Sequence, residues 1–578
     1  MFGKAFAVFE LHTLFALTIT LLVVPFVIMA LTAYTLHYQG KLYFLSNTPL
    51  VPQPTPHPIE DKPTTTRGWR GFFRFPVAFA VASGAAVGVA FLVNRVNPMI
   101  AYSSEYSVWV MFVTAWFSVM WFILKGADEV RPTSLARGYA FIQQWLLWFM
   151  VLIGVAVSID RGKLASGYFL LPGYAGVFLG AWLSLLECFW LPGKPSPEQQ
   201  RGYDREVHTS GESQSSASDG PEDEETDVTE STPLFRGENR PTTFGGYSHA
   251  EEPSQDEDDE DETPAGVYGK EQSWSAHQPT WIWIPQFLLA VPVPIIFVTS
   301  VALLIITSTA KTGADGNSML SFYLLACILS ILLLLPTVPF LHRLSYHIPL
   351  FIFIITVATT IYNLTSFPFS DVNRLKIYFQ QQVDFDANTT TTVLVGHTDY
   401  IAALVATHLP SAAGVALNTT SDPLRAGLTR VEFPGLPPPV DASFLNTSAT
   451  ALGATAARFT ISARDSRACK LLFDTPVEAI HLNSRNHPVS KVLGDPTPEG
   501  GAKEIRLWSR EWETEWDVEV RWKGEGKLTG KAVCLWSDAN EMERSVPALW
   551  EVVRFAPRWS VVSKLSDGLV EGWRGFEL

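Results

Sequence analysis

The chain has 578 residues, which is too long for one ordinary domain. Hydrophobic residues make up 47% of it and charged residues only 17%, a balance that argues against a purely soluble protein. The net charge of −15 does not describe the whole chain, because residues 201–278 hold 21 acidic and only 5 basic residues and the remainder is close to neutral. No nucleic-acid partner is expected from this composition.

Eight hydrophobic runs are each long enough to cross a bilayer of about 30 Å as a helix of about 20 residues. Trp and Tyr gather at several run ends, as expected for rings at the level of the lipid headgroups. We interpret the first run as a span and not as a signal peptide, because it is long and only Lys4 precedes it as a basic residue. The sequence therefore predicts a multi-pass α-helical membrane domain with about eight spans in contact with membrane lipid. The runs are Thr13–Tyr34, Phe75–Val93, Tyr106–Leu124, Tyr139–Ser158, Phe169–Trp190, Trp283–Ile306, Leu320–Leu341 and Leu344–Tyr362.

Two local features shape the later spans. Only His342 and Arg343 separate the seventh run from the eighth, so we expect a tight helical hairpin there. Pro285, Pro292 and Pro294 are expected to bend the sixth helix, because proline removes a backbone donor and clashes with the preceding turn.

Residues 201–280 form a segment of different composition, with the run "SQDEDDEDE" at its centre. Such a segment cannot bury enough apolar surface to offset its chain entropy, so we predict a disordered acidic loop in the cytosol. It is a solvated spacer or a substrate for an acid-directed kinase. Glu230, Leu234 and Phe235 in "ESTPLF" resemble a sorting signal read by a cytosolic adaptor, although chance matches to this pattern are common.

Residues 363–578 contain short alternating runs of apolar and β-branched residues, such as "RLKIYF", "ARFTI" and "DVEVRW", separated by Gly, Pro, Asn and Asp. This pattern predicts a β-sandwich-like domain. The chain is thus divided into a first membrane block (1–200), the acidic loop (201–280), a second membrane block (281–362) and a C-terminal β-rich domain (363–578).

The acceptor sequons Asn-x-Ser/Thr all follow the last predicted span. Glycans are attached only in the secretory lumen, so this position favours a lumenal, glycosylated C-terminal domain. Basic residues of the short loops favour the same orientation weakly, with eight on the cytosolic side and five on the lumenal side. The four acceptors are Asn363, Asn388, Asn418 and Asn446.

The four cysteines divide in the same way. Cys188 and Cys327 lie in membrane runs and are interpreted as packing residues. Cys469 and Cys534 are the two cysteines of the predicted lumenal domain, where an oxidising environment favours a disulfide. Two buried free thiols remain the alternative.

The stretch "TTTTVLVGHTDY" raises the question of a zinc site, because zinc exopeptidases carry a strand that ends in His-x-Asp. His397 and Asp399 match that pattern, but the further acidic ligands and the general base are missing after them. The two Glu-Glu pairs lie in the acidic loop, ahead of His397 and across the membrane from it. No GxSxG, HExxH, GxxxxGK[ST] or CxxC motif occurs either, so we predict no catalytic and no metal-binding residue in this chain.

Polar residues inside the spans are candidates for a transport path or for bonds between helices. Gln143 and Gln144 are adjacent and cannot both face one partner, which favours inter-helix hydrogen bonds. Glu187 lies close to the cytosolic end of its span, so we expect it to reach solvent there.

Several long motifs together resemble the fungal vacuolar membrane proteases, a family of the zinc aminopeptidase type. The likeness runs through nearly the whole chain apart from the acidic loop. It is carried by "FGKAFAVFELHTLFAL" (2–17), "GWRGFFRFP" (68–76), "VNPMIAYSSEYSVW" (96–109), "GADEVRPTSLARGY" (126–139), "CLWSD" (534–538) and "WSVVSKLSDGLVEG" (559–572).

The resemblance implies a multi-pass protein of the vacuolar membrane with a glycosylated lumenal tail. It also implies that zinc-dependent peptide hydrolysis belongs to a peptidase domain that lies ahead of the membrane block, and that this chain starts where that domain stops. On this basis the chain is the non-catalytic membrane and lumenal portion, has no cofactor of its own, and has an unidentified lumenal partner. A stand-alone transporter or channel, or a scaffold that binds partners, is the alternative.

Overall fold

The computed structural model describes residues 10–44, 71–191 apart from 131, 132, 134 and 165, 279–484 apart from 280, 424 and 426, 500–537 apart from 524 and 525, and 545–578. The predicted acidic loop (201–280), with Glu230, Leu234 and Phe235, lies outside these residues except for residue 279. The chain divides into two compact units, each described by itself. Unit 1 comprises residues 1–90, 109–304 and 324–361, and unit 2 comprises residues 91–108, 305–323 and 362–578.

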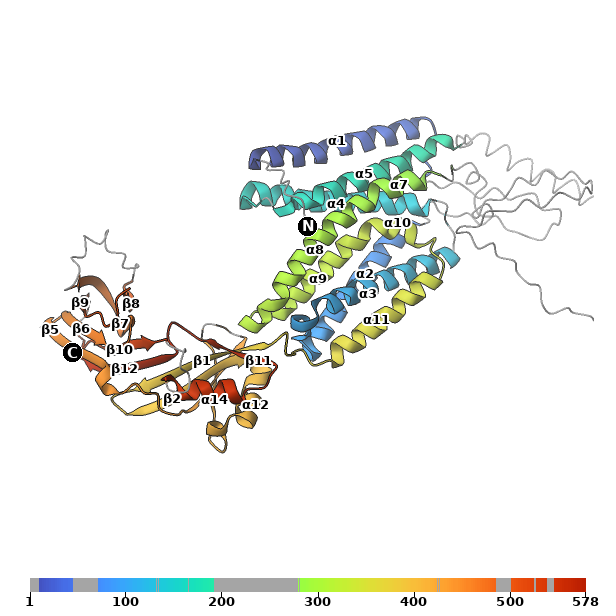
Figure 1. Cartoon of the computed structure of the whole chain (residues 1–578). Coiled ribbons are helices and arrows are strands. Elements are labelled where there is room, and N and C mark those ends of the chain that lie inside the picture. Colours follow the sequence, from blue (N-terminus) through green and yellow to red (C-terminus); the bar gives the residue numbers. More distant parts are fainter. Residues whose placement is uncertain are drawn as a thin grey trace, which may run out of the picture. The chain divides into compact units, whose positions relative to one another are not determined.

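Eight helical segments among the described residues are long and apolar enough to cross a membrane, as predicted. The chain order of the helices can be followed by colour in Figure 1. Their α-helical parts are α1 (Leu11–Tyr38), α2 (Arg74–Val96), α3 (Ile100–Val130), α4 (Ala136–Gly162), α5 (Leu171–Leu186), α7 (Trp283–Ala290) with α8 (Pro292–Thr309), α9 (Met319–Leu334) with α10 (Val338–Leu341), and α11 (His347–Thr365). Short 3₁₀ turns at Ser166–Leu170, Glu187–Trp190, Ala310–Asp315 and Leu335–Thr337 extend or join them.

Proline divides the sixth span where the sequence predicts a bend. Helix α7 ends at Ala290 and α8 begins at Pro292. Because Pro292 has no N–H to donate, the regular ladder is interrupted at this point. The predicted hairpin also holds, since α10 ends at Leu341 and α11 begins at His347.

Small residues let α5 approach its neighbours closely within unit 1. A Cβ atom at Gly180 would lie 2.5 Å from the ring of Phe141 in α4, and one at Gly176 would lie 2.6 Å from the carbonyl oxygen of Leu289 in α7. Lipid offers no hydrophobic drive for helix association, so close packing of this kind is a main source of stability between spans.

The described part of the C-terminal region contains twelve strands that hydrogen bonds join into one mixed sheet. The order along the sheet is β3-β4-β2-β1-β12-β10-β7-β9-β6-β5, with β11 beside β1 and β8 beside β7. Strand β1 is parallel to β11 and β12, and the other pairs are antiparallel. The strands are β1 (Leu375–Asp384), β2 (Thr389–His397), β3 (Asn418–Ser421), β4 (Leu428–Pro434), β5 (Leu445–Gly453), β6 (Ala456–Ala463), β7 (Ala468–Ser484), β8 (Ala502–Trp508), β9 (Trp516–Trp522), β10 (Thr529–Trp536), β11 (Ser560–Lys564) and β12 (Val570–Glu577).

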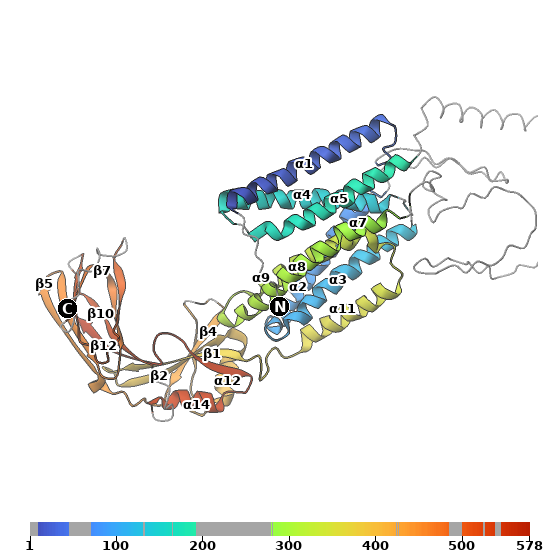
Figure 2. The same ribbon diagram turned by 45° about the horizontal axis from the view of Figure 1, so that its top comes forward.

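Two helices accompany this sheet. Helix α12 (Thr398–His408) follows β2 directly, and α14 (Pro547–Phe555) precedes β11; both lie beside β1 and β2 (Figures 1 and 2). Ile401 of α12 and Val552 of α14 are buried in the same core as Phe379 and Phe433 of the strands. The prediction of a multi-pass helical part followed by a β-rich domain is therefore confirmed.

Candidate functional site

His397, the one residue with a zinc-site pattern, caps a helix. It ends β2 and is the N-cap of α12, where its Nδ1 accepts a hydrogen bond from the backbone N–H of Asp399 at 3.4 Å. Burial lowers the pKa of His397, and the Asp399 carboxylate, 3.6 Å from Nδ1, partly opposes that shift. The part of the chain that the structure describes holds no group of three or more His, Cys, Asp or Glu side chains that could bind a metal ion. The surroundings of His397 therefore do not fit a zinc site.

A buried ionic cluster lies in unit 1 between α4, α5 and α7. The guanidinium of Arg137 donates to Glu187 Oε1 at 2.6 Å, and Gln286 Nε2 donates to the same oxygen at 3.1 Å and to Ser184 Oγ at 3.0 Å. Glu187 is only 4% exposed. The expectation that Glu187 reaches solvent is therefore wrong, because a charged partner and an amide already satisfy the carboxylate inside the helices.

The two adjacent glutamines of α4 bind different neighbours, as predicted. Gln143 Nε2 donates to the carbonyl oxygen of Phe72 at 2.5 Å, just ahead of α2. Gln144 Nε2 donates to the carbonyl oxygen of Leu335 at 2.7 Å, in the turn between α9 and α10. Both bonds join segments far apart in sequence, so these side chains hold the helices of unit 1 together and lend no support to a transport path.

A charged contact in unit 2 joins a helix end to the sheet. Asp315, at the end of the 3₁₀ turn Ala310–Asp315, accepts from Tyr378 Oη at 2.5 Å and from Lys376 Nζ at 3.1 Å. The guanidinium of Arg425 lies 4.3 Å from the centre of the Tyr378 ring. Burial, and then the hydrogen bond to Asp315, raise the pKa of Tyr378 to about 12. The phenol therefore remains a neutral donor to the carboxylate.

Further bonds in unit 2 tie the ends of α2 and α8 to the chain that leads into β1. Lys311 Nζ donates to Asn373 Oδ1 at 3.1 Å and to the carbonyl oxygen of Tyr102. Asn97 Nδ2 donates to the carbonyl oxygens of Asn363 at 3.1 Å and Ser366 at 2.8 Å. In the sequence, the signal for such residues is weak: it is a lone polar residue at the end of an apolar run, which is costly to bury unless it is hydrogen-bonded.

The four predicted glycan acceptors have different environments. Asn388 lies in the β1–β2 turn, Asn418 is the first residue of β3 and Asn446 is the second residue of β5; all three are exposed. Asn363 is fully buried in the last turn of α11. A folded chain can therefore present three of the four acceptors, and we expect no glycan on Asn363.

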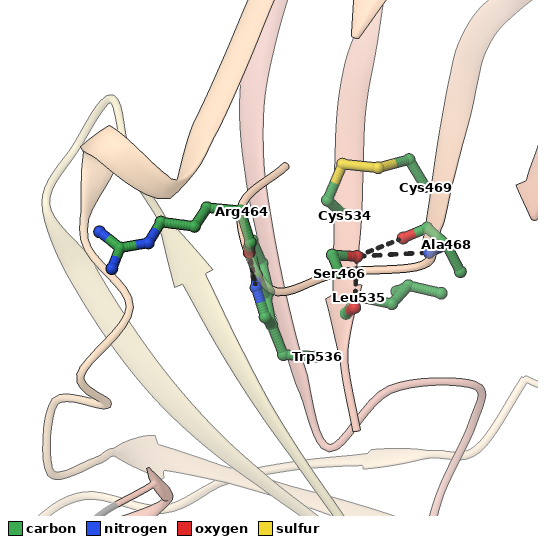
Figure 3. Close-up of a disulfide and its surroundings, with 7 residues drawn as sticks. All are labelled: Arg464, Ser466, Ala468, Cys469, Cys534, Leu535 and Trp536. Carbon is green, nitrogen blue, oxygen red and sulfur yellow. Dashed lines mark hydrogen bonds between the residues drawn. A yellow bond between two sulfur atoms is a disulfide. The ribbon is translucent and has the colours of Figure 1, made fainter. Parts of the chain in front are cut away.

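The structure joins Cys469 and Cys534 in a disulfide between β7 and β10 (Figure 3). The two residues are direct cross-strand partners in the antiparallel register. Next to them, Ser466 Oγ donates to the carbonyl oxygen of Leu535 at 2.7 Å (Figure 3). The disulfide thus lies within the ladder and closes a long connection between the two strands.

Comparison with known proteins relates both parts of the chain to one family. Residues 73–348 match the family described as "Vacuolar membrane protease, transmembrane domain", and residues 375–571 match "Vacuolar membrane protease, C-terminal domain". A vacuolar membrane protease of Tuber melanosporum (strain Mel28) is 44% identical over 607 residues, which cover 99% of this chain and 61% of that protein.

Two further relatives agree. The vacuolar membrane protease of Aspergillus niger is 40% identical over 621 residues, and that of Phaeosphaeria nodorum is 39% identical over 608 residues. Each alignment covers 100% of this chain and 62% of the relative. The chain therefore spans about three fifths of the length of the curated relatives it matches.

Proposed function

Because this chain belongs to the vacuolar membrane protease family, we propose that it is the membrane-embedded and lumenal portion of such a protein and does not itself supply the residues for peptide hydrolysis. In this proposal the zinc-dependent activity of the family belongs to residues other than those of this chain, which needs no cofactor of its own. Eight helices long and apolar enough to cross a membrane, together with relatives named vacuolar membrane protease, support a multi-pass protein of the vacuolar membrane.

The non-catalytic role is supported above all by the position of His397, which caps helix α12. Its Nδ1 atom is committed to the Asp399 backbone as a helix cap. Because Nδ1 accepts this bond, the neutral ring carries its proton on Nε2, and neither nitrogen has a free lone pair for a metal ion. A zinc site also needs about three further ligands around the ion. The geometry around Lys376 and Tyr378 supports a different role, in which bonds to Asp315 fix the β-rich domain to the end of a membrane helix.

We further propose that the β-rich domain is lumenal and that the acidic loop is cytosolic. The support is that three of the four acceptor sequons, at Asn388, Asn418 and Asn446, follow the last span, and the fourth lies in its last turn. The acidic segment, by contrast, lies between two groups of spans. In that orientation the loop is accessible to a sorting adaptor or an acid-directed kinase, and the β-rich domain to a lumenal partner.

The non-catalytic role can be tested on the purified full chain by metal analysis and an aminopeptidase assay with and without chelator. We expect substoichiometric zinc and no chelator-sensitive hydrolysis. The matched variant His397→Asn keeps a helix cap and removes the imidazole, so it should behave as the parent chain does. Stoichiometric zinc that is lost in His397→Asn, together with chelator-sensitive cleavage, would overturn the proposal.

Orientation is tested separately by protease protection in sealed vacuolar vesicles. One epitope is placed after Leu578 and another within residues 201–278. We expect the C-terminal epitope to be protected and the loop epitope to be cleaved. The reverse result would show that the β-rich domain faces the cytosol.

A further inference from the structure

The ends of the twelve-stranded sheet are strands with one open side. Among the described residues, β3 pairs only with β4, and β5 pairs only with β6. Both views place β5 at the outer margin of the strands (Figures 1 and 2). Near its start, Arg574 of β12 donates to the carbonyl oxygen of Ala442 at 2.7 Å, but no ladder joins β12 to β5. An open strand edge is a template for pairing with another chain.

The open-edged strands of the described region differ in charge. Strand β8 pairs only with β7 and carries Lys503, Glu504 and Arg506; β11 pairs only with β1 and carries Lys564. Charged side chains, lysine above all, are a common protection of such edges. By contrast, β3 (NTTS) and β5 (LNTSATALG) contain no charged residue and no proline. These two edges therefore lack protection by charge or by proline.

Each of the two uncharged edge strands has a glycan acceptor within its first two residues. Asn418 is the first residue of β3, and Asn446 is the second residue of β5. Both side chains are exposed. The charged edge strands β8 and β11 carry no sequon. The third exposed acceptor, Asn388, lies in the turn between β1 and β2 and not on an open edge.

From this complementary distribution, we propose that oligosaccharides on Asn418 and Asn446 block the two uncharged sheet edges against pairing with a second copy of the chain. The inference rests on the proposed lumenal orientation. Strand pairing requires an approach to about 4.8 Å, which a bulky, solvated glycan on an edge residue prevents.

The modification is compatible with the local contacts. A bond forms between the asparagine Nδ2 and the anomeric carbon of an oligosaccharide, the bond from that carbon to the phosphate of a lipid-diphosphate donor breaks, and one amide proton is released. The remaining Nδ2 hydrogen of Asn418 can still be donated to Glu432 Oε2, which lies 3.1 Å away.

The test uses the full chain, expressed in a host that glycosylates lumenal domains and purified in detergent. Endoglycosidase mobility shifts give the number of glycans, and size-exclusion chromatography at rising concentration gives the share of associated protein. The double variant Asn418→Gln/Asn446→Gln should lose two glycans and show a several-fold larger associated share. The control Asn388→Gly should lose one glycan without that rise, since glycine accepts the φ of +53° at this turn.

A charge-rescue variant separates edge protection from a general need for glycans in folding. Asn418→Lys/Asn446→Lys also lacks both glycans but restores a charge on each edge, so it should elute as the parent chain does. If the parent chain carries the glycans and the glutamine variant shows no rise in association, the inference is overturned, while the proposed orientation stands. Association of the lysine variant equal to that of the glutamine variant also overturns it. A parent chain with no glycan, together with cleavage of the C-terminal epitope in vesicles, overturns the orientation and the inference together.

Discussion

Removal of the Cys469–Cys534 disulfide should destabilise the β-rich domain strongly. The two cysteines are 65 residues apart, and the bridge closes that loop in the unfolded chain. The loss of loop-closure entropy for a loop of this length corresponds to about 4 kcal/mol at 25 °C. The variant should be Cys469→Ala/Cys534→Ala, because a single substitution would leave a reactive thiol in the core.

For a domain of this size, each kcal/mol shifts the unfolding midpoint by about 2–4 °C, so the midpoint should fall by about 8–16 °C. The assay is hydrogen exchange of the full chain in detergent along a temperature series, read on peptides from β7 and β10. The control Cys188→Ala/Cys327→Ala removes the two buried cysteines of the helices that form no disulfide, and it should leave those peptides unchanged. Alkylation under denaturing conditions should label two cysteines without reductant and four with it.

A different count of thiols would decide between the two interpretations that the sequence leaves open. Four thiols labelled without reductant would show that Cys469 and Cys534 are free in the native protein. Two labelled thiols together with a midpoint shift below about 2 °C would refute the loop-entropy reasoning itself, because the bridge would then exist without restricting the unfolded chain.

Three further substitutions test the polar contacts. Glu187→Gln should cost about 3–5 kcal/mol in the stability of the membrane helices, since it removes the carboxylate that binds the buried Arg137. In thermal unfolding in detergent, the double variant with Arg137→Gln should lose less than the single variant, and an equal loss would contradict the pairing. Asp315→Ala should lower the free energy of unfolding by about 1–3 kcal/mol, because it removes the acceptor of the Tyr378 hydroxyl. In a double-mutant cycle this loss should be smaller when Tyr378→Phe is already present, and strictly additive losses would contradict the contact. Burial lowers the pKa of His397, so the stability that the neutral imidazole contributes is present above about pH 6.5 and is lost as the pH falls and Nδ1 becomes protonated. His397→Asn should therefore flatten the pH dependence of the unfolding midpoint, and an unchanged slope would contradict the assignment to His397.

The spans were predictable because one strong term, the transfer of about 20 apolar residues into lipid, outweighs local detail. Their ends were less predictable: the helix from Ile100 to Val130 is interrupted at Ser104, whose φ of −137° and ψ of 47° are not helical, so one extra helical turn precedes the run predicted from Tyr106. The strand positions were predictable from the alternation of apolar residues, and the Gly, Pro, Asn and Asp residues between the runs separate one strand from the next.

The alternating pattern predicts strands in the β-rich domain but neither of its two longer helices. The segment Thr398–His408 is a helix whose buried residues Ile401, Leu404 and Val405 lie at helical spacing. Pro547–Phe555 has proline at its start and an apolar stripe, so a helical period was available to find it. The parallel pairing of β1 with β11 joins residues such as Leu375 and Ser560 and is decided by tertiary packing, which no local pattern encodes.

The site residues show that a polar residue in a sequence does not reveal which partner its side chain binds. Gln144 and Glu187 are both polar groups in spans, and in lipid each must find a protein partner because water is absent. The partner of Gln144 is a backbone carbonyl 191 residues away, and that of Glu187 is a guanidinium 50 residues away. The sequons also differ in their surroundings. Asn388 and Asn446 are exposed to solvent and remain accessible for glycosylation, while Asn363, which is in the same type of motif, is buried at the end of a span. A functional assignment from a motif therefore depends on the surroundings of the side chain, which separate a structural bond from a site that another molecule can reach.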